Sequence, residues 1–139
     1  MKTIALIFTF ILSSTLTLIQ TEKGQDVTVT IENISNNRGT LAVGLHSEAT
    51  FMKSGGIKNM SSKITGDKVT VTFKDVAPGN YAIMVLHDEN NNKQMDFEPN
   101  GMPAESFGIS NNPTLMGPPM FSDGKFEVGK ENVELTIKL

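Results

Sequence analysis

The chain has 139 residues, with 12 Lys and Arg against 15 Asp and Glu, a formal net charge of −3 and no cysteine. This mild acidity, without any basic cluster, excludes nucleic acid as a partner, because nucleic-acid binding needs a concentrated basic face. The lack of cysteine excludes disulfides and thiolate metal sites, so a hard cation is the kind of metal to consider.

Residues 1–20 are typical of a secretory signal peptide. Lys2 gives a basic start, Ile4 to Leu12 is almost wholly apolar, and small polar residues follow. No A-x-A motif marks the cleavage point, which we place between Thr15 and Thr21. A retained anchor is the alternative, since the intermittent apolar run of about 17 residues lies at the lower limit for a membrane span. We expect export, secreted or periplasmic, with no membrane span after cleavage and one domain at residues 21–139.

Most of the remaining chain shows the pattern of strands. Residues 27–31, 40–46, 68–73 and 132–139 alternate apolar with polar side chains and are rich in β-branched residues. Such alternation predicts half-buried antiparallel strands. The run YAIMVL at 81–86 is apolar on both sides, which predicts a central strand covered on both faces. Together these segments predict an all-β fold, an antiparallel β-sandwich of about seven strands.

The connections differ in length and composition. ISNNRGT at 34–40 lies between two alternating runs and predicts a hairpin. Residues 47–63 allow one helical turn around Ala49 to Lys53, which Gly55 and Gly56 would end. Residues 98–121 hold five of the six prolines together with several large apolar side chains. We expect this segment to be one long loop wrapped onto the domain, since disordered segments lack such apolar content.

The candidate site follows the central strand, in the stretch HDENNNKQMDFEPNG at 87–101. Counted from its first Asp, side chains with oxygen recur at positions 1, 3, 5, 7 and 9. These residues are Asp88, Asn90, Asn92, Gln94 and Asp96. Calcium-binding loops present oxygens at this spacing, with position 7 using its backbone carbonyl. The five residues are therefore candidate Ca²⁺ ligands.

The stretch departs from the EF-hand pattern at two positions, so a turn without a metal is the alternative interpretation. Lys93 stands at position 6, where Gly is preferred, and Pro99 stands at position 12, where a bidentate Glu would sit. Glu89, Glu98 and Glu105 are the candidates for that missing carboxylate. Asn and Asp also form turns without a metal, because their side chains hydrogen-bond to nearby backbone.

Catalytic signals are weak. His46 and His87 each end a strand run, and a metal-dependent hydrolase would need both rings to converge with Asp88. The alternative is a hydrogen-bonded histidine at a strand end. There is no G-x-S-x-G elbow, and a glycosidase carboxylate pair would lack an aromatic sugar platform, because the chain has no Trp and one Tyr. We expect no enzymatic activity.

Several linked motifs span nearly the whole chain after residue 20. They comprise Pro78, Gly79, Tyr81 and Ala82; His87, Asp88, Asn90, Asn92 and Asp96; Gly101, Pro103 and Glu105; and Phe107, Gly108, Ser110 and Asn111. In these motifs the chain resembles the bacterial family catalogued as domain of unknown function 2141, although the family's usual Gly in the asparagine block is Lys93 or Asn92 here. The resemblance implies a secreted or periplasmic β-sandwich, similar to transthyretin-like and Cna-B-like modules. It implies no activity.

The expected function is that of an exported, non-catalytic β-sandwich, a binding or envelope-structural module with Ca²⁺ as the one candidate cofactor. The partner would be a protein or a small-molecule ligand of unknown identity. The first alternative is a transthyretin-like carrier of a small ligand or carbohydrate, which a large apolar cavity would favour. The second is the metal-dependent hydrolase.

Overall fold

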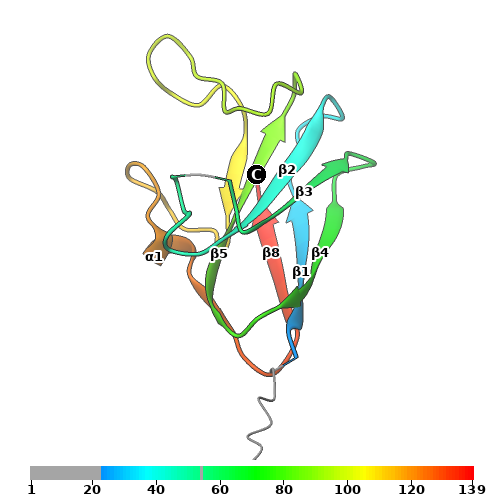
Figure 1. Ribbon diagram of the computed structural model, residues 1–139. Coiled ribbons are helices and arrows are strands. Elements are labelled where there is room, and N and C mark those ends of the chain that lie inside the picture. The colour runs from blue at the N-terminus through cyan, green and yellow to red at the C-terminus, as the bar shows by residue number, and fades with distance from the viewer. Residues whose placement is uncertain (1–22, 54) are drawn as a thin grey trace, which may run out of the picture.

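A computed structural model describes residues 23–53 and 55–139, so the predicted signal peptide lies outside the described residues. Within these ranges we find no helix with the length and apolar character to cross a membrane. The described chain forms eight strands and one short helix (Figure 1): β1 (Gln25–Glu32), β2 (Thr40–His46), β3 (Lys58–Lys63), β4 (Val69–Val76), β5 (Gly79–Asp88), β6 (Phe107–Ile109), α1 (Phe121–Gly124), β7 (Phe126–Val128) and β8 (Val133–Lys138).

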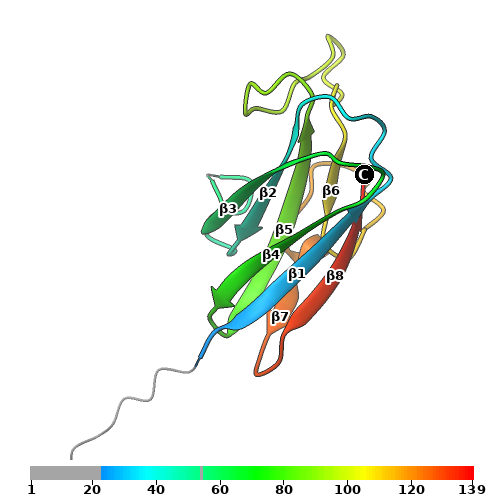
Figure 2. The same cartoon turned by 90° about the vertical axis from the view of Figure 1, so that its right-hand side faces the viewer.

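The strands form two sheets that lie face to face (Figure 2). One has the order β4–β1–β8; the other follows β3–β2–β5–β6, with β7 also paired to β5. β1 and β8 run parallel, and the other named pairs are antiparallel. The predicted all-β sandwich is confirmed, with eight strands where about seven were expected.

The main core lies between the sheets and is built from the alternating apolar residues. Its members on β1, β2 and β4 are Val27, Val29, Ile31, Leu41, Val43, Leu45, Val69, Val71, Phe73 and Val76, each at most 7% exposed. β5 is a central strand, as its sequence predicts; its inner face is buried, and its outer face is buried at Ala82 but only partly buried at Met84 and Leu86. Ile83 and Val85 belong to the main core, whereas Ala82 packs with Phe51 and Ile109 in a second cluster on the other face.

The predicted hairpin at 34–40 is wrong. β1 and β2 belong to different sheets, so this connection crosses from one sheet to the other and closes over the end of β5. Gly39 lies there with φ +67, and a Cβ at this position would lie 1.8 Å from the carbonyl oxygen of Asp88. Residues 34–40 do form a turn-rich connection, but turn residues do not specify which strands pair.

Segment 47–63 contains the expected turn and a strand that the sequence did not reveal. The Phe51 amide donates to the Ser47 carbonyl at 3.0 Å, and β3 follows at Lys58–Lys63. Its sequence KNMSSK has no apolar alternation, because β3 is an edge strand whose side chains are mostly exposed.

The long segment 98–121 lies on the domain, as predicted, but contains a strand. β6 pairs with the middle of β5, and Leu115 and Phe121 pack against the second cluster. Met102 and Met116 remain 62% and 98% exposed. Apolar residues therefore anchor this segment at its centre and end.

Candidate functional site

The candidate site begins where β5 ends. Asp88 is 2% exposed, and its carboxylate closes the turn that follows. Oδ1 accepts a hydrogen bond from the Asn92 amide at 3.1 Å, and Oδ2 accepts one from the Lys93 amide at 2.9 Å. Lys93 has φ +63, so the turn forms with a lysine in the left-handed conformation that favours glycine.

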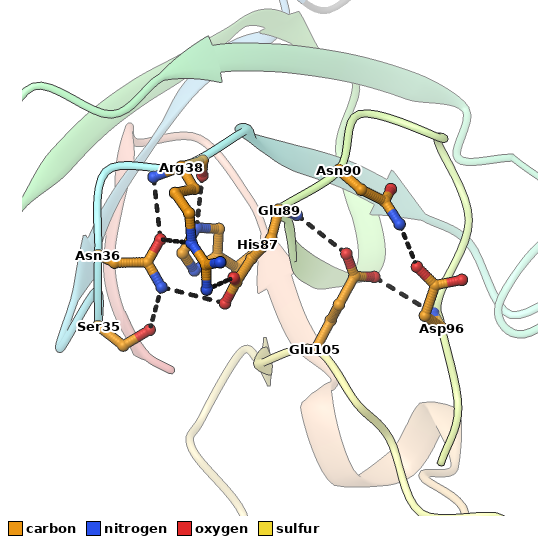
Figure 3. A network of polar contacts seen from close by, with 8 residues as sticks. All are labelled: Ser35, Asn36, Arg38, His87, Glu89, Asn90, Asp96 and Glu105. Atoms are coloured by element: carbon orange, nitrogen blue, oxygen red, sulfur yellow. Dashed lines mark hydrogen bonds and ion pairs between the residues drawn. The ribbon is translucent and has the colours of Figure 1, made fainter. Parts of the chain in front are cut away.

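Asn90 and Asn92 continue the turn and face a second carboxylate. The Asn90 Oδ1 accepts from the Asn92 amide, and the Asn92 Oδ1 accepts from the Gln94 amide, both at 2.9 Å. The Asn90 carboxamide nitrogen donates to Asp96 at 2.5 Å (Figure 3). The Asn92 carboxamide nitrogen also donates to Asp96, at 3.0 Å. The structure therefore brings Asp88, Asn90, Asn92 and Asp96 together, and Gln94 joins them through its backbone amide.

Glu105 ties the two ends of this loop together. It is 7% exposed. Its Oε1 accepts from the Glu89 amide at 2.9 Å, and its Oε2 accepts from the Asp96 amide at 3.2 Å (Figure 3). Of the three glutamates considered for the missing carboxylate, Glu105 is the one that lies inside the loop. Its distance in sequence from Asp88 explains why spacing alone did not single it out.

Glu89 belongs to a neighbouring polar network on the connection between the sheets (Figure 3). Its carboxylate forms an ion pair with Arg38 and accepts from the Asn36 side chain at 3.1 Å. Asn36 in turn accepts from the Arg38 amide at 2.9 Å. Glu98, by contrast, is exposed in the turn that follows. Neither glutamate joins the group around Asp96.

His87 lies fully buried beside this network. Its Nε2 is 2.9 Å from the Arg38 carbonyl oxygen, and because a carbonyl can only accept, Nε2 carries the proton. Nδ1 is then a bare acceptor, buried and without a hydrogen-bond partner among the described residues. Sequence reasoning predicted a strand-end histidine but gave no signal for the unpartnered nitrogen.

The two histidine side chains lie far apart. In the register of β2 with β5, His87 pairs with Leu41, whereas His46 pairs with Ala82 at the other end of the ladder. Five residues of strand separate them, about 17 Å at ~3.4 Å per residue. His46 instead places Nδ1 3.4 Å from the Thr50 hydroxyl, and burial lowers its pKa. The constellation needed for the hydrolase is therefore absent from this part of the chain.

The donor set of the loop is mixed rather than purely acidic. Within residues 23–53 and 55–139, no group of three or more His, Asp or Glu side chains is arranged to hold a metal ion. The side chains that gather in the loop belong to two aspartates and two asparagines. Such a set suits a hard cation such as Ca²⁺ and not a transition metal.

Other motif residues fasten β6 to its surroundings. Ser110 accepts from the Ile83 amide at 3.0 Å and donates to the Gly124 carbonyl. Asn111 donates to the Lys125 carbonyl at 2.9 Å. A Cβ at Gly108 would lie 2.7 Å from the Lys138 carbonyl oxygen. These motif residues hold the fold around the loop.

The fold and loop define a class of protein: a β-sandwich that carries an Asp- and Asn-rich turn at the end of its central strand. The chain belongs to the family described as uncharacterized protein conserved in bacteria, domain of unknown function 2141, whose model matches residues 29–136. Neither a curated protein nor a solved structure matches significantly.

Proposed function

We propose that this domain is an exported, non-catalytic module, binding or envelope-structural in role, whose β5–β6 loop binds Ca²⁺. One observation carries the proposal: the side chains of Asp88, Asn90, Asn92 and Asp96 converge within a single turn. Asp88 caps the amides at positions 5 and 6 of the loop, and Asn90 and Asn92 each cap the amide two residues ahead. This arrangement supports a preorganised loop, whose backbone is held in one conformation by hydrogen bonds in the absence of an ion.

The chemistry of the four side chains fits a hard cation. Each carboxamide or carboxylate oxygen that accepts one backbone N–H keeps a second lone pair for a cation. Ca²⁺ accepts six to eight such oxygens at about 2.3–2.6 Å, with water completing the set. The cation would take the place of the two carboxamide N–H groups that now donate to Asp96.

The affinity should be low, because few carboxylates contribute and Pro99 stands where a bidentate Glu would sit. Extracellular calcium modules of this kind have Kd values of about 10⁻⁴–10⁻³ M. At ~1 mM Ca²⁺ and a Kd of ~10⁻⁴ M, binding adds ~1.4 kcal/mol to the free energy of unfolding. For a domain of this size, that raises Tm by roughly 5 °C.

Thermal unfolding with 1 mM Ca²⁺ and with EGTA tests this proposal, together with calorimetric titration of Ca²⁺. We expect a higher midpoint with Ca²⁺ in the wild type and no difference in Asp96→Asn. Asp67→Asn makes the same charge change in the exposed turn before β4 and should keep the calcium response. Equal midpoints of the wild type in both conditions would contradict the calcium site.

Export is tested separately. Fractionation of the host cell, with intact mass measurement, should locate the protein outside the cytoplasm and without its first 15–21 residues. A full-length cytoplasmic product would contradict the proposed location.

A further inference from the structure

We propose that the outer face of the five-stranded sheet binds a small apolar molecule that carries a carboxylate. This face has a groove of about 330 Å³, at the lower end of the ~300–1,000 Å³ range of small-molecule sites. At ~30 Å³ per water-sized group, the groove accommodates roughly eleven non-hydrogen atoms. That size suits a compact ligand.

The sequence of β2 creates the groove. Ala42 and Gly44, which alternate with the core residues of this strand, form its floor on the outer face. Larger residues flank Gly44 on both neighbouring strands: Asn59 on β3 and Met84 on β5. Two small residues between longer ones leave a trough in the sheet surface. Phe107 of β6 extends its apolar wall.

Gly44 also lets a polar group reach the floor. A Cβ at this position would lie 2.6 Å from Nε2 of His46, so the imidazole edge occupies the space that a side chain would fill. Nδ1 of the same ring faces the Thr50 hydroxyl. Nε2 has no hydrogen-bond partner in the described chain, and it can pair with a polar group of a ligand.

Lys93 determines the charge of the ligand. Among the described residues, it is the one Lys, Arg, Asp or Glu that lines the groove, and it takes part in none of their ion pairs. Its backbone is fixed, because its amide donates to Asp88. An ammonium beside an apolar trough complements a carboxylate attached to an apolar body.

Titration of the purified protein with octanoate tests the proposal. By calorimetry and ¹H–¹⁵N spectra, we expect saturable binding that shifts the amide signals of Gly44 and Lys93. Octanol, which has the same chain without the charge, should bind about tenfold more weakly. Lys93→Gln should weaken octanoate binding about tenfold and leave octanol binding unchanged, whereas Lys93→Arg should retain it. The control Lys130→Gln, exposed beyond β7, should bind like the wild type.

The location is tested with Ala42→Leu, which fills the floor and should abolish binding of both octanoate and octanol at an unchanged Tm. Each titration is run with Ca²⁺ and with EGTA, so failure of the calcium proposal does not affect this one. No shift at Gly44, equal affinity for octanoate and octanol, or full binding by a folded Ala42→Leu variant would overturn the proposal.

Discussion

Glu105 is a buried side chain that ties the two ends of the β5–β6 loop together. Its two carboxylate oxygens accept from the amides of Glu89 and Asp96. In Glu105→Gln one oxygen becomes an NH₂ donor that faces another donor, so one charge-assisted bond is lost. We expect the free energy of unfolding to fall by about 1.5–3 kcal/mol, measured by urea denaturation. Glu98→Gln, exposed on the same segment, should change it by less than about 0.5 kcal/mol. Equal losses in the two variants would contradict this role.

The proton on His87 can be located directly. Because Nε2 faces the Arg38 carbonyl and Nδ1 has no partner among the described residues, we expect the Nε2–H tautomer. A long-range ¹H–¹⁵N correlation spectrum at pH 7 distinguishes the two ring nitrogens, and a His46→Gln variant assigns the signals to His87. A protonated Nδ1 would mean that the Arg38 carbonyl bond is not formed.

At the scale of elements, β6 and β8 approach each other across the sandwich at Gly108. A Cβ there would lie 2.6 Å from Ile137 Cγ2 and 2.7 Å from the Lys138 carbonyl oxygen, and the backbone atom cannot move aside without shifting β8. Gly108→Ala should therefore lower the free energy of unfolding by about 1–3 kcal/mol. Gly117→Ala has open space around it and should be neutral or stabilising by up to ~1 kcal/mol. Chemical denaturation compares the two, and a neutral Gly108→Ala would show that the strands are not closely packed.

The elements also show what the sequence could predict. The alternation of apolar and polar residues identified β1, β2, β4 and β8, because a strand with one buried face shows this pattern in its own sequence. The partners of β1 and β2 depend on contacts far apart in the chain, so a turn-rich connection was misread as a hairpin. In the loop, the spacing from Asp88 to Asp96 predicted their convergence. Glu105 and the Arg38 carbonyl reach the site from distant segments, so their roles could not be predicted from spacing.

At the scale of the whole molecule, three groups with lowered pKa values make the native state less stable in acid: His46, Asp26 and Glu32. Burial lowers the pKa of His46 below its ordinary 6.5, so below pH 6.5 the unfolded chain binds a proton that the native ring resists. The Lys74 and Lys68 ammonium groups lower the pKa of Asp26 and Glu32 below their ordinary 3.8 and 4.5. Their contribution is present above those ordinary values and is lost as pH falls through the native ones. Stability should therefore decline in two steps, the first below pH 6.5 and the second below pH 4.5.

Calorimetric Tm measured from pH 7.5 to pH 3 tests this expectation. The wild type should lose Tm between pH 7 and pH 5, and His46→Gln should flatten that first step, because no group at position 46 then titrates. The second step should persist in His46→Gln and shrink in ~0.5 M salt, since salt screens the exposed ion pairs on β1. A first step of equal size in His46→Gln would assign it to another group.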